Sequence, residues 1–476
     1  MTYETYIVDY PETQRKLEDI DIKLLDQFLE FLFEKKIFRG EDLTELIDKI
    51  NKYKISIQDP NRIGVSKKQI VARELIDQIY SSIMSPDPEL ENREYFSLLL
   101  RFQEASFRYY HENNRDHLIH SLRVFLLIFA IFRALDAEWI NILKDFLQDL
   151  LEKLDISSES DIRMRLSSKD LWKISVRAAS LMSLFHDIGI VPSRCGKLIE
   201  GLIDTIFRSP DGRDDLSIFS FQLELKEEYK EAIEFLLPFF EKLFKRFHPK
   251  HVELFQKLEE DFERLKKPFK NEDIKILASM HGSLSLFLVY ILPIIKITLS
   301  GQSLKERLIE AVDSLILLET TIAIFAHDKE NHITVSPLSE ILIFADVSQE
   351  WDRIQYKKGK MTRYQRDEIK IGLHRCKNGE SILSFYEGDQ FEEMEELEKL
   401  REKFKKMLSD MRKKGKFGIL INLSVNSDST NIKNPYSSIF RCKFHSRLLD
   451  CEDMSTRDKI PYERFCRNCT KNTRKR

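Results

Sequence analysis

Residues 181–190 read Leu-Met-Ser-Leu-Phe-His-Asp-Ile-Gly-Ile, and they say more about this chain than any other stretch of similar length. An apolar run with helical spacing ends here in two ionisable residues, His186 and Asp187. A buried carboxylate is costly unless it is paired or binds a metal ion. The His-Asp dipeptide alone is a weak signal, because it is common by chance. Its weight comes from similar segments elsewhere in the chain.

Four more apolar segments carry an isolated histidine or aspartate, and each predicts a helix with a polar group near its buried face. An unpaired buried polar group costs about 1–3 kcal/mol, so convergence on one or two metal ions removes a large penalty. The alternative is a helical scaffold with hydrogen-bonded core histidines. Imidazole and carboxylate ligands without thiolate favour Fe, Mn, Zn or Ni. The predicted metal ligands are His120, His186, Asp187, His281, His327 and Asp346.

The order and the flanks of these residues resemble the HD-domain superfamily of metal-dependent phosphohydrolases. The matching motifs are His120-Ser-Leu-Arg-Val, His186-Asp187-Ile-Gly and Asp346 in Phe-Ala-Asp-Val, and the resemblance covers about residues 100–360. It implies a helical bundle in which these four side chains bind a first metal ion. In that arrangement Asp187 also bridges to a second ion.

His281 and His327 fit the binuclear branch of this superfamily, which includes HD-GYP and cyclic nucleotide phosphodiesterases, and by resemblance they hold the second ion. The chain departs from the HD-GYP pattern in three ways. It has Ile190 in place of a lysine, it lacks Gly-Tyr-Pro, and it has His327-Asp328 in place of paired histidines. These departures argue against cyclic-di-GMP as substrate. We interpret Asp328 as a residue that orients a ligand histidine, with a direct ligand or a solvated residue as alternatives.

The resemblance implies hydrolysis of a nucleotide or phosphodiester through a metal-activated hydroxide, with Asp187 bridging the ions. The leaving group needs a proton donor, and the candidates are His117 and Asp116, which share a helix face with the first ligand. The choice between them stays open. Three basic residues are weak candidates for phosphate contacts, or else ordinary surface charges: Arg194, Lys197 and Arg353.

Two other functions stay open. The first is a catalytically silent HD fold that binds and senses a nucleotide. The second is a nucleic-acid-directed phosphodiesterase that uses the basic residues near position 476. A formal net charge of -3 gives no global drive toward nucleic acid or an anionic membrane.

Composition favours a mostly α-helical protein of more than one domain. The 476 residues include only 14 Gly and 13 Pro, and 33% are charged. The longest apolar run, residues 284–297, is shorter than a membrane span and contains Pro293 and Lys296. We expect a cytoplasmic protein that does not contact a membrane. The sequence does not indicate an oligomeric state.

Changes in pattern along the chain predict four parts. In order, they are an N-terminal helical region at 1–95, the metal-dependent phosphohydrolase core at 96–360 with a helical insertion at 197–270, a small α+β unit at 361–440, and a basic tail with cysteines at 441–476.

Within these parts, some local patterns are specific. His248 and His251 of the insertion read as solvated loop residues. The α+β unit begins with strand-like alternation at 368–376, followed by a hairpin signal at Asn378-Gly379. A further strand is predicted at 416–425.

The tail contains four cysteines, Cys442, Cys451, Cys466 and Cys469, of which the last two form a Cys-x2-Cys pair. A structural zinc site and unpaired reduced thiols are equally good interpretations, because the spacing of the first two is irregular. The basic residues around them indicate either a frayed tail or a contact with nucleic acid.

Overall fold

The computed structural model is mostly α-helical over the residues that it describes, which confirms the predicted fold class. Those residues are 3–10, 18–35, 41–58, 65–84, 117–153, 167–189, 227–268, 280–286, 312–327, 335–349, 354–357, 360–363, 368–375, 381–389, 418–425, 439–442 and 451–454.

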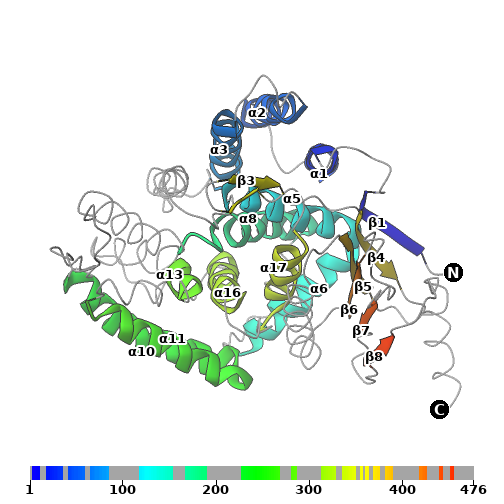
Figure 1. The fold of residues 1–476 in the computed structure, drawn as a ribbon. Helices are drawn as coiled ribbons and strands as arrows, with labels where there is room; N and C mark the ends of the chain where they lie inside the picture. Colours follow the sequence, from blue (N-terminus) through cyan, green and yellow to red (C-terminus); the bar gives the residue numbers. More distant parts are fainter. Residues whose placement is uncertain are drawn as a thin grey trace, which may run out of the picture.

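Two helices form the middle of the molecule, α5 (His117–Leu135) and α8 (Ser168–Phe185). They pack against each other and lie between the N-terminal helices and the pair α16 (Val312–His327) and α17 (Pro337–Ser348) (Figure 1). Within the described residues, one segment is long and apolar enough to cross a membrane, Leu118–Leu135 of α5, and 89% of it is buried inside the structure. A helix that is apolar all round is typical of a protein core as well as of a membrane.

Side-chain caps set where α8 and α17 begin. Ser167 accepts a hydrogen bond from the backbone N–H of Asp170, whose side chain bonds back to the Ser167 N–H. Ser336 and Ser339 form the same reciprocal pair ahead of α17, with Pro337 at its first position. A Ser-Pro pair is a sequence pattern typical of a helix start, and α17 begins at this pair. Each cap satisfies N–H groups that have no partner within the helix.

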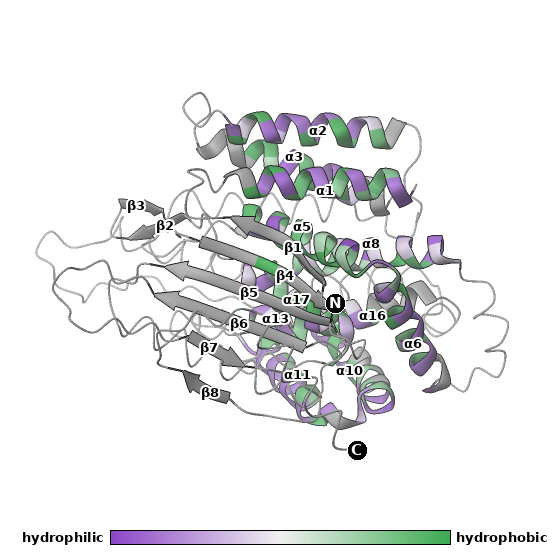
Figure 2. Cartoon of the chain, turned by 90° about the vertical axis from the view of Figure 1, so that its right-hand side faces the viewer, coloured by the Kyte–Doolittle hydropathy of each residue, from purple (hydrophilic) through white to green (hydrophobic). Residues whose placement is uncertain are grey.

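Two helices cover the other face of α5 and α8, α1 (Glu18–Lys35) and α3 (Val65–Met84), and α2 (Glu41–Gln58) packs on these two. In Figure 2, α1 and α2 carry both purple and green along their length, as amphipathic helices at a surface do. Phe28 of α1 meets Phe125 and Phe129 of α5 edge to face, with ring centroids 5.2 and 4.8 Å apart.

A buried ion pair also joins α1 to α5. The Arg123 guanidinium donates through Nε to Asp21 Oδ1 at 2.8 Å and through Nη2 to Asp21 Oδ2 at 2.7 Å. Arg123 and Asp21 are buried at 3% and 0% exposure. Because a buried charge is costly when its partner is missing, this pair fixes α5 firmly against α1.

The remaining helices lie around one edge of the bundle. They are α6 (Ala137–Lys153), α10 (Glu227–Phe247), the 3-10 turn η2 (Pro249–His251), α11 (Val252–Leu265) and α13 (His281–Leu286). The prediction that His248 is solvated is wrong. It is buried, and its Nε2 lies 2.8 Å from Glu319 Oε1 on α16. The sequence signal was misleading because His248 is buried against Glu319 of α16, whereas the adjacent Pro249 is exposed. His251 is partly exposed.

A four-stranded sheet has the order β1-β4-β5-β6. Its strands are β1 (Tyr3–Tyr10), β4 (Glu368–Arg375), β5 (Ser381–Asp389) and β6 (Gly418–Val425). β4 and β5 are antiparallel, with Arg375 opposite Ser381, which confirms the predicted hairpin, and β6 is parallel to β5. Two short ribbons pair β2 (Ile354–Lys357) with β3 (Lys360–Arg363), and β7 (Ile439–Cys442) with β8 (Cys451–Met454).

The position of β1 corrects the expectation that residues 1–95 are entirely helical. Residues 3–10 are antiparallel to β4, with Tyr3 opposite Arg375 and Tyr10 opposite Ile369. This segment, Tyr-Glu-Thr-Tyr-Ile-Val-Asp-Tyr, is rich in aromatic and β-branched residues, which favour a pleated strand. The N-terminal region therefore contributes to the same sheet as residues more than 350 positions later in the chain.

Candidate metal centre

All six predicted metal ligands come together in one place, and they arrive from five helices. His120 lies in the first turn of α5, His186 and Asp187 directly follow α8, and Asp346 lies inside α17. His281 is the first residue of α13 and His327 is the last residue of α16. His120 and Asp346 form the α5–α17 side of the centre, and His281 and His327 form its α13–α16 side.

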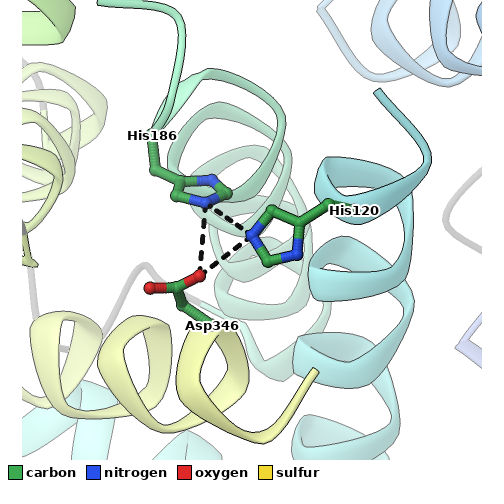
Figure 3. A group of neighbouring side chains, drawn as sticks. All are labelled: His120, His186 and Asp346. Carbon is green, nitrogen blue, oxygen red and sulfur yellow. Dashed lines mark hydrogen bonds and ion pairs between the residues drawn. The ribbon is translucent and has the colours of Figure 1, made fainter. Parts of the chain in front are cut away.

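His120, His186 and Asp346 form a tight group (Figure 3). His120 Nε2 lies 2.9 Å from Asp346 Oδ1, and His186 Nε2 lies 3.6 Å from the same oxygen. The Nε2 atoms of the two histidines are 3.3 Å apart. Both rings are buried, whereas the Asp346 side chain is 22% exposed. The group therefore sits at the edge of the core, with its carboxylate on the open side.

The spacing of these atoms fits a metal ion. Two nitrogens about 2.0–2.1 Å from one tetrahedral ion lie about 3.3–3.4 Å apart, and the two Nε2 atoms match that separation at 3.3 Å. Nitrogen atoms that both carry lone pairs repel each other at this distance unless a proton or a cation lies between them. These buried residues can hold a metal ion.

Asp187 lies between the two sides, and each of its oxygens faces a different pair of histidines. Oδ2 is 3.8 Å from His120 Nε2 and 3.5 Å from His186 Nε2. Oδ1 is 3.6 Å from His281 Nε2 and 3.7 Å from His327 Nε2. The other carboxylate, Asp346, lies against His120 and His186. Asp187 thus has the arrangement of a carboxylate that can contact two cations at once.

Three of the histidines present the same ring nitrogen to this centre because their other nitrogen is engaged. His186 donates from Nδ1 to the Ser183 carbonyl at 2.7 Å, and His327 does so to the Ile324 carbonyl. The acceptor for His120 Nδ1 is Oε1 of Gln349. A hydrogen on Nδ1 leaves Nε2 as the nitrogen that binds a cation.

The carboxylates of Asp187 and Asp346 favour a bound proton or cation at the centre. Burial lowers the pKa of His186, but the charges of Asp187 and Asp346 and a hydrogen bond to Asp346 raise it, to about 9. Burial raises the pKa of Asp346, but hydrogen bonds and charges from His120 and His186 hold it well below its usual range. In the metal-free chain a proton on His186 supplies the positive charge, and a metal ion can replace it.

The turn after His186 is fastened to α13 by close backbone packing. A methyl group at Gly189 would overlap the His281 carbonyl oxygen and lie 2.6 Å from the Ser285 backbone nitrogen, so only glycine fits here. Ser285 Oγ accepts from the Gly189 N–H at 2.8 Å and donates to the His186 carbonyl at 2.7 Å. This contact places His281 next to Asp187.

Other predicted site residues are not placed beside the centre. His117 is the first residue of α5, and the structure describes only its backbone. Cys442 and Cys451 lie opposite each other across β7 and β8. The following residues lie outside the described residues: Asp116, Arg194, Lys197, Asp328, Arg353, Cys466 and Cys469.

Sequence reasoning missed two residues that contact the ligands, Gln349 and Ser285. Gln349 follows Asp346 by three residues, so a polar residue one helical turn after a predicted ligand was the available signal. Ser285 is one of two serines in His-Gly-Ser-Leu-Ser-Leu, and that pattern does not single it out.

No protein-family model, no curated protein and no solved structure matches the chain.

Proposed function

We propose that this chain is a metal-dependent phosphohydrolase that acts on a nucleotide or a phosphodiester, as its resemblance to the HD-domain superfamily implies. The observation that carries the proposal is the position of Asp187, whose two oxygens face two separate pairs of histidines. A purely structural carboxylate needs only one good partner. An aspartate that bridges two cations needs each of its oxygens to face the other ligands of one cation.

The proposed division of ligands follows the geometry. His120, His186, Asp346 and Asp187 would hold one ion, and His281, His327 and Asp187 would hold the other. Nitrogen and carboxylate ligands of this kind suit Fe, Mn, Zn or Ni. Neutral imidazoles add no charge, so Asp187 and Asp346 offset only part of the charge of two divalent ions. The centre therefore keeps a net positive charge that attracts a phosphate ester.

When bound, a pair of divalent ions generates a nucleophile from water at neutral pH and neutralises charge on the phosphoryl oxygens. The protein residues hold the ligands in place and exclude water from one side. His186 is fully buried, whereas the side chains of Asp346 and His281 are 22% and 20% exposed. The substrate therefore approaches from the face of Asp346 and His281. The candidate proton donors for the leaving group are His117 and Asp116, at the beginning of α5.

The test is to purify wild type, Asp187→Asn and Asp170→Asn side by side. Metal content is measured by mass spectrometry, and hydrolysis of bis(4-nitrophenyl) phosphate is measured with added Mn²⁺. Asp170 is a matched control, because its carboxylate is partly exposed and caps the beginning of α8, whereas Asp187 directly follows the end of this helix. We expect Asp187→Asn to lose both metal and hydrolysis and the control to lose neither.

Two outcomes would count against the proposal. If Asp187→Asn keeps its metal and its activity, the carboxylate is structural and the activity has another origin. If wild type binds metal but hydrolyses no phosphomonoester, phosphodiester or nucleotide in a broad panel, the centre belongs to a nucleotide sensor.

A further inference from the structure

The buried histidines of the centre are oriented in two different ways. His186 and His327 each donate Nδ1–H to a carbonyl three residues earlier in the same helix, Ser183 and Ile324. The end of the helix therefore fixes the ring without help from another part of the chain. These two rings keep their orientation as long as their own helix end is intact.

His120 depends on a distant residue instead. Its Nδ1 is bonded to Oε1 of Gln349, which is 229 positions away in sequence. Gln349 directly follows α17, its backbone N–H bonds to the Ala345 carbonyl, and its residue is 0% exposed. A buried amide is costly unless it is hydrogen-bonded, so the ring and the amide each satisfy the other.

Gln349 and Asp346 hold the same imidazole from its two nitrogens. They lie three residues apart on one helical turn, so their side chains point the same way. Asp346 Oδ1 lies 2.9 Å from Nε2 of His120, and Gln349 Oε1 lies at Nδ1. An amide oxygen only accepts hydrogen bonds. With the amide oxygen facing the ring, Nδ1 carries a hydrogen, and Nε2 is the nitrogen that faces Asp346 and the centre.

We propose that Gln349 is a positioning residue that fixes the tautomer and the orientation of His120 for binding a divalent transition metal ion. The inference rests on the proposed function. A neutral amide achieves this without adding a third negative charge beside Asp187 and Asp346, and so preserves the positive charge that attracts an anionic ester. Outer partners of this kind change metal affinity by about 10- to 100-fold when they are removed.

The experiment compares the full chain with Gln349→Leu and Gln349→Glu, after a chelator has removed bound metal. Each protein is titrated with Co²⁺, whose visible absorption reports the number and type of ligands, in competition with a chelator of known affinity. Gln349→Leu removes the acceptor and keeps a similar volume, whereas Gln349→Glu keeps an oxygen acceptor in the same place. Thermal melting of the metal-free proteins shows whether each variant is folded.

We expect Gln349→Leu to weaken the binding of one Co²⁺ ion by about 10- to 100-fold and to change its absorption spectrum. The ion at His281 and His327 keeps its affinity. Gln349→Glu restores wild-type affinity or exceeds it, because a carboxylate also accepts from Nδ1 and makes the ring a stronger ligand. Rescue by Glu separates positioning from a general loss of packing, which both variants would share.

The inference is overturned if Gln349→Leu binds Co²⁺ with the affinity and spectrum of wild type, or if Gln349→Glu binds as weakly as Gln349→Leu. If Gln349→Leu does not fold, the Glu variant decides alone, since loss of Co²⁺ affinity by a folded Gln349→Glu contradicts the positioning role. A wild-type chain that binds no Co²⁺ overturns the proposed function itself, which distinguishes the two failures.

Discussion

The two sides of the centre are built by different means. On the α5–α17 side, His120 is held by side chains from a distant part of the sequence, Asp346 and Gln349. On the α13–α16 side, His281 is placed by the close approach of Gly189 to the backbone of α13, and His327 by a carbonyl of its own helix. Side-chain contacts hold one side, and backbone contacts hold the other.

The difference indicates which changes each side tolerates. A side-chain hydrogen bond can be removed or replaced one atom at a time, so the α5–α17 side should respond in graded steps. Backbone packing leaves no room for an added atom, so the α13–α16 side should respond sharply to a single methyl group. The two ions of the proposed centre should therefore be separable by mutation.

The largest expected loss of stability comes from breaking the buried ion pair between Arg123 and Asp21. Arg123 lies one helical turn after His120, so this pair also anchors the α5–α17 side of the centre. Arg123→Met leaves the Asp21 carboxylate buried without its guanidinium, and we expect a loss of about 3–5 kcal/mol in the free energy of unfolding. Chemical denaturation followed by circular dichroism measures it. The double variant Asp21→Leu/Arg123→Met should recover most of the loss. An unchanged stability for the single variant would mean that α1 does not fix the α5–α17 side.

Gly189→Ala should weaken the α13–α16 side of the centre. The new methyl group would overlap the His281 carbonyl, so α13 must shift, at a cost of about 1–3 kcal/mol. We expect one metal ion to be lost and the ion at His120 and Asp346 to remain. Metal content and denaturation provide the measurements.

Ser285→Ala is the matched comparison for Gly189→Ala. It removes the hydrogen bonds to Gly189 and His186 without a steric overlap, so about 1 kcal/mol is expected and both ions should be retained. Equal effects of the two variants would show that the tight backbone approach has no special role.

A separate prediction concerns the pH dependence that His186 gives to metal binding. The pKa of His186 is raised from 6.5 to about 9. Its protonation therefore stabilises the metal-free fold fully below pH 6.5, and this contribution is lost as pH rises through about 9. A metal ion must displace that proton, so affinity should rise by about tenfold per pH unit between about pH 7 and pH 9.

Competition titrations with a chelator at several pH values measure this slope. Asp346 remains ionised throughout the window, because its pKa is lowered, and it contributes no slope there. Metal affinity that does not change with pH would contradict a proton on His186.

The residues that come together at the candidate centre could be predicted from sequence, because each is an isolated polar residue in an apolar helical run. The hairpin of β4 and β5 and the start of α17 were predictable for a similar reason, since Asn-Gly and Ser-Pro act over a few residues. Gln349 could not be predicted, because its role depends on a side chain 229 positions away. The burial of His248 and the pairing of residues 3–10 with β4 are likewise consequences of tertiary packing.

The pairing of β1 with β4 has a consequence during synthesis on the ribosome. Residues 3–10 emerge well before their partner strand, residues 368–375. At about 5–20 residues per second, translation takes on the order of tens of seconds to cover that interval. Throughout it, a segment rich in tyrosine, isoleucine and valine has no strand to pair with. Nascent-chain binding factors can bind the segment during this interval. A slowly translated codon tract between the two strands would lengthen the interval.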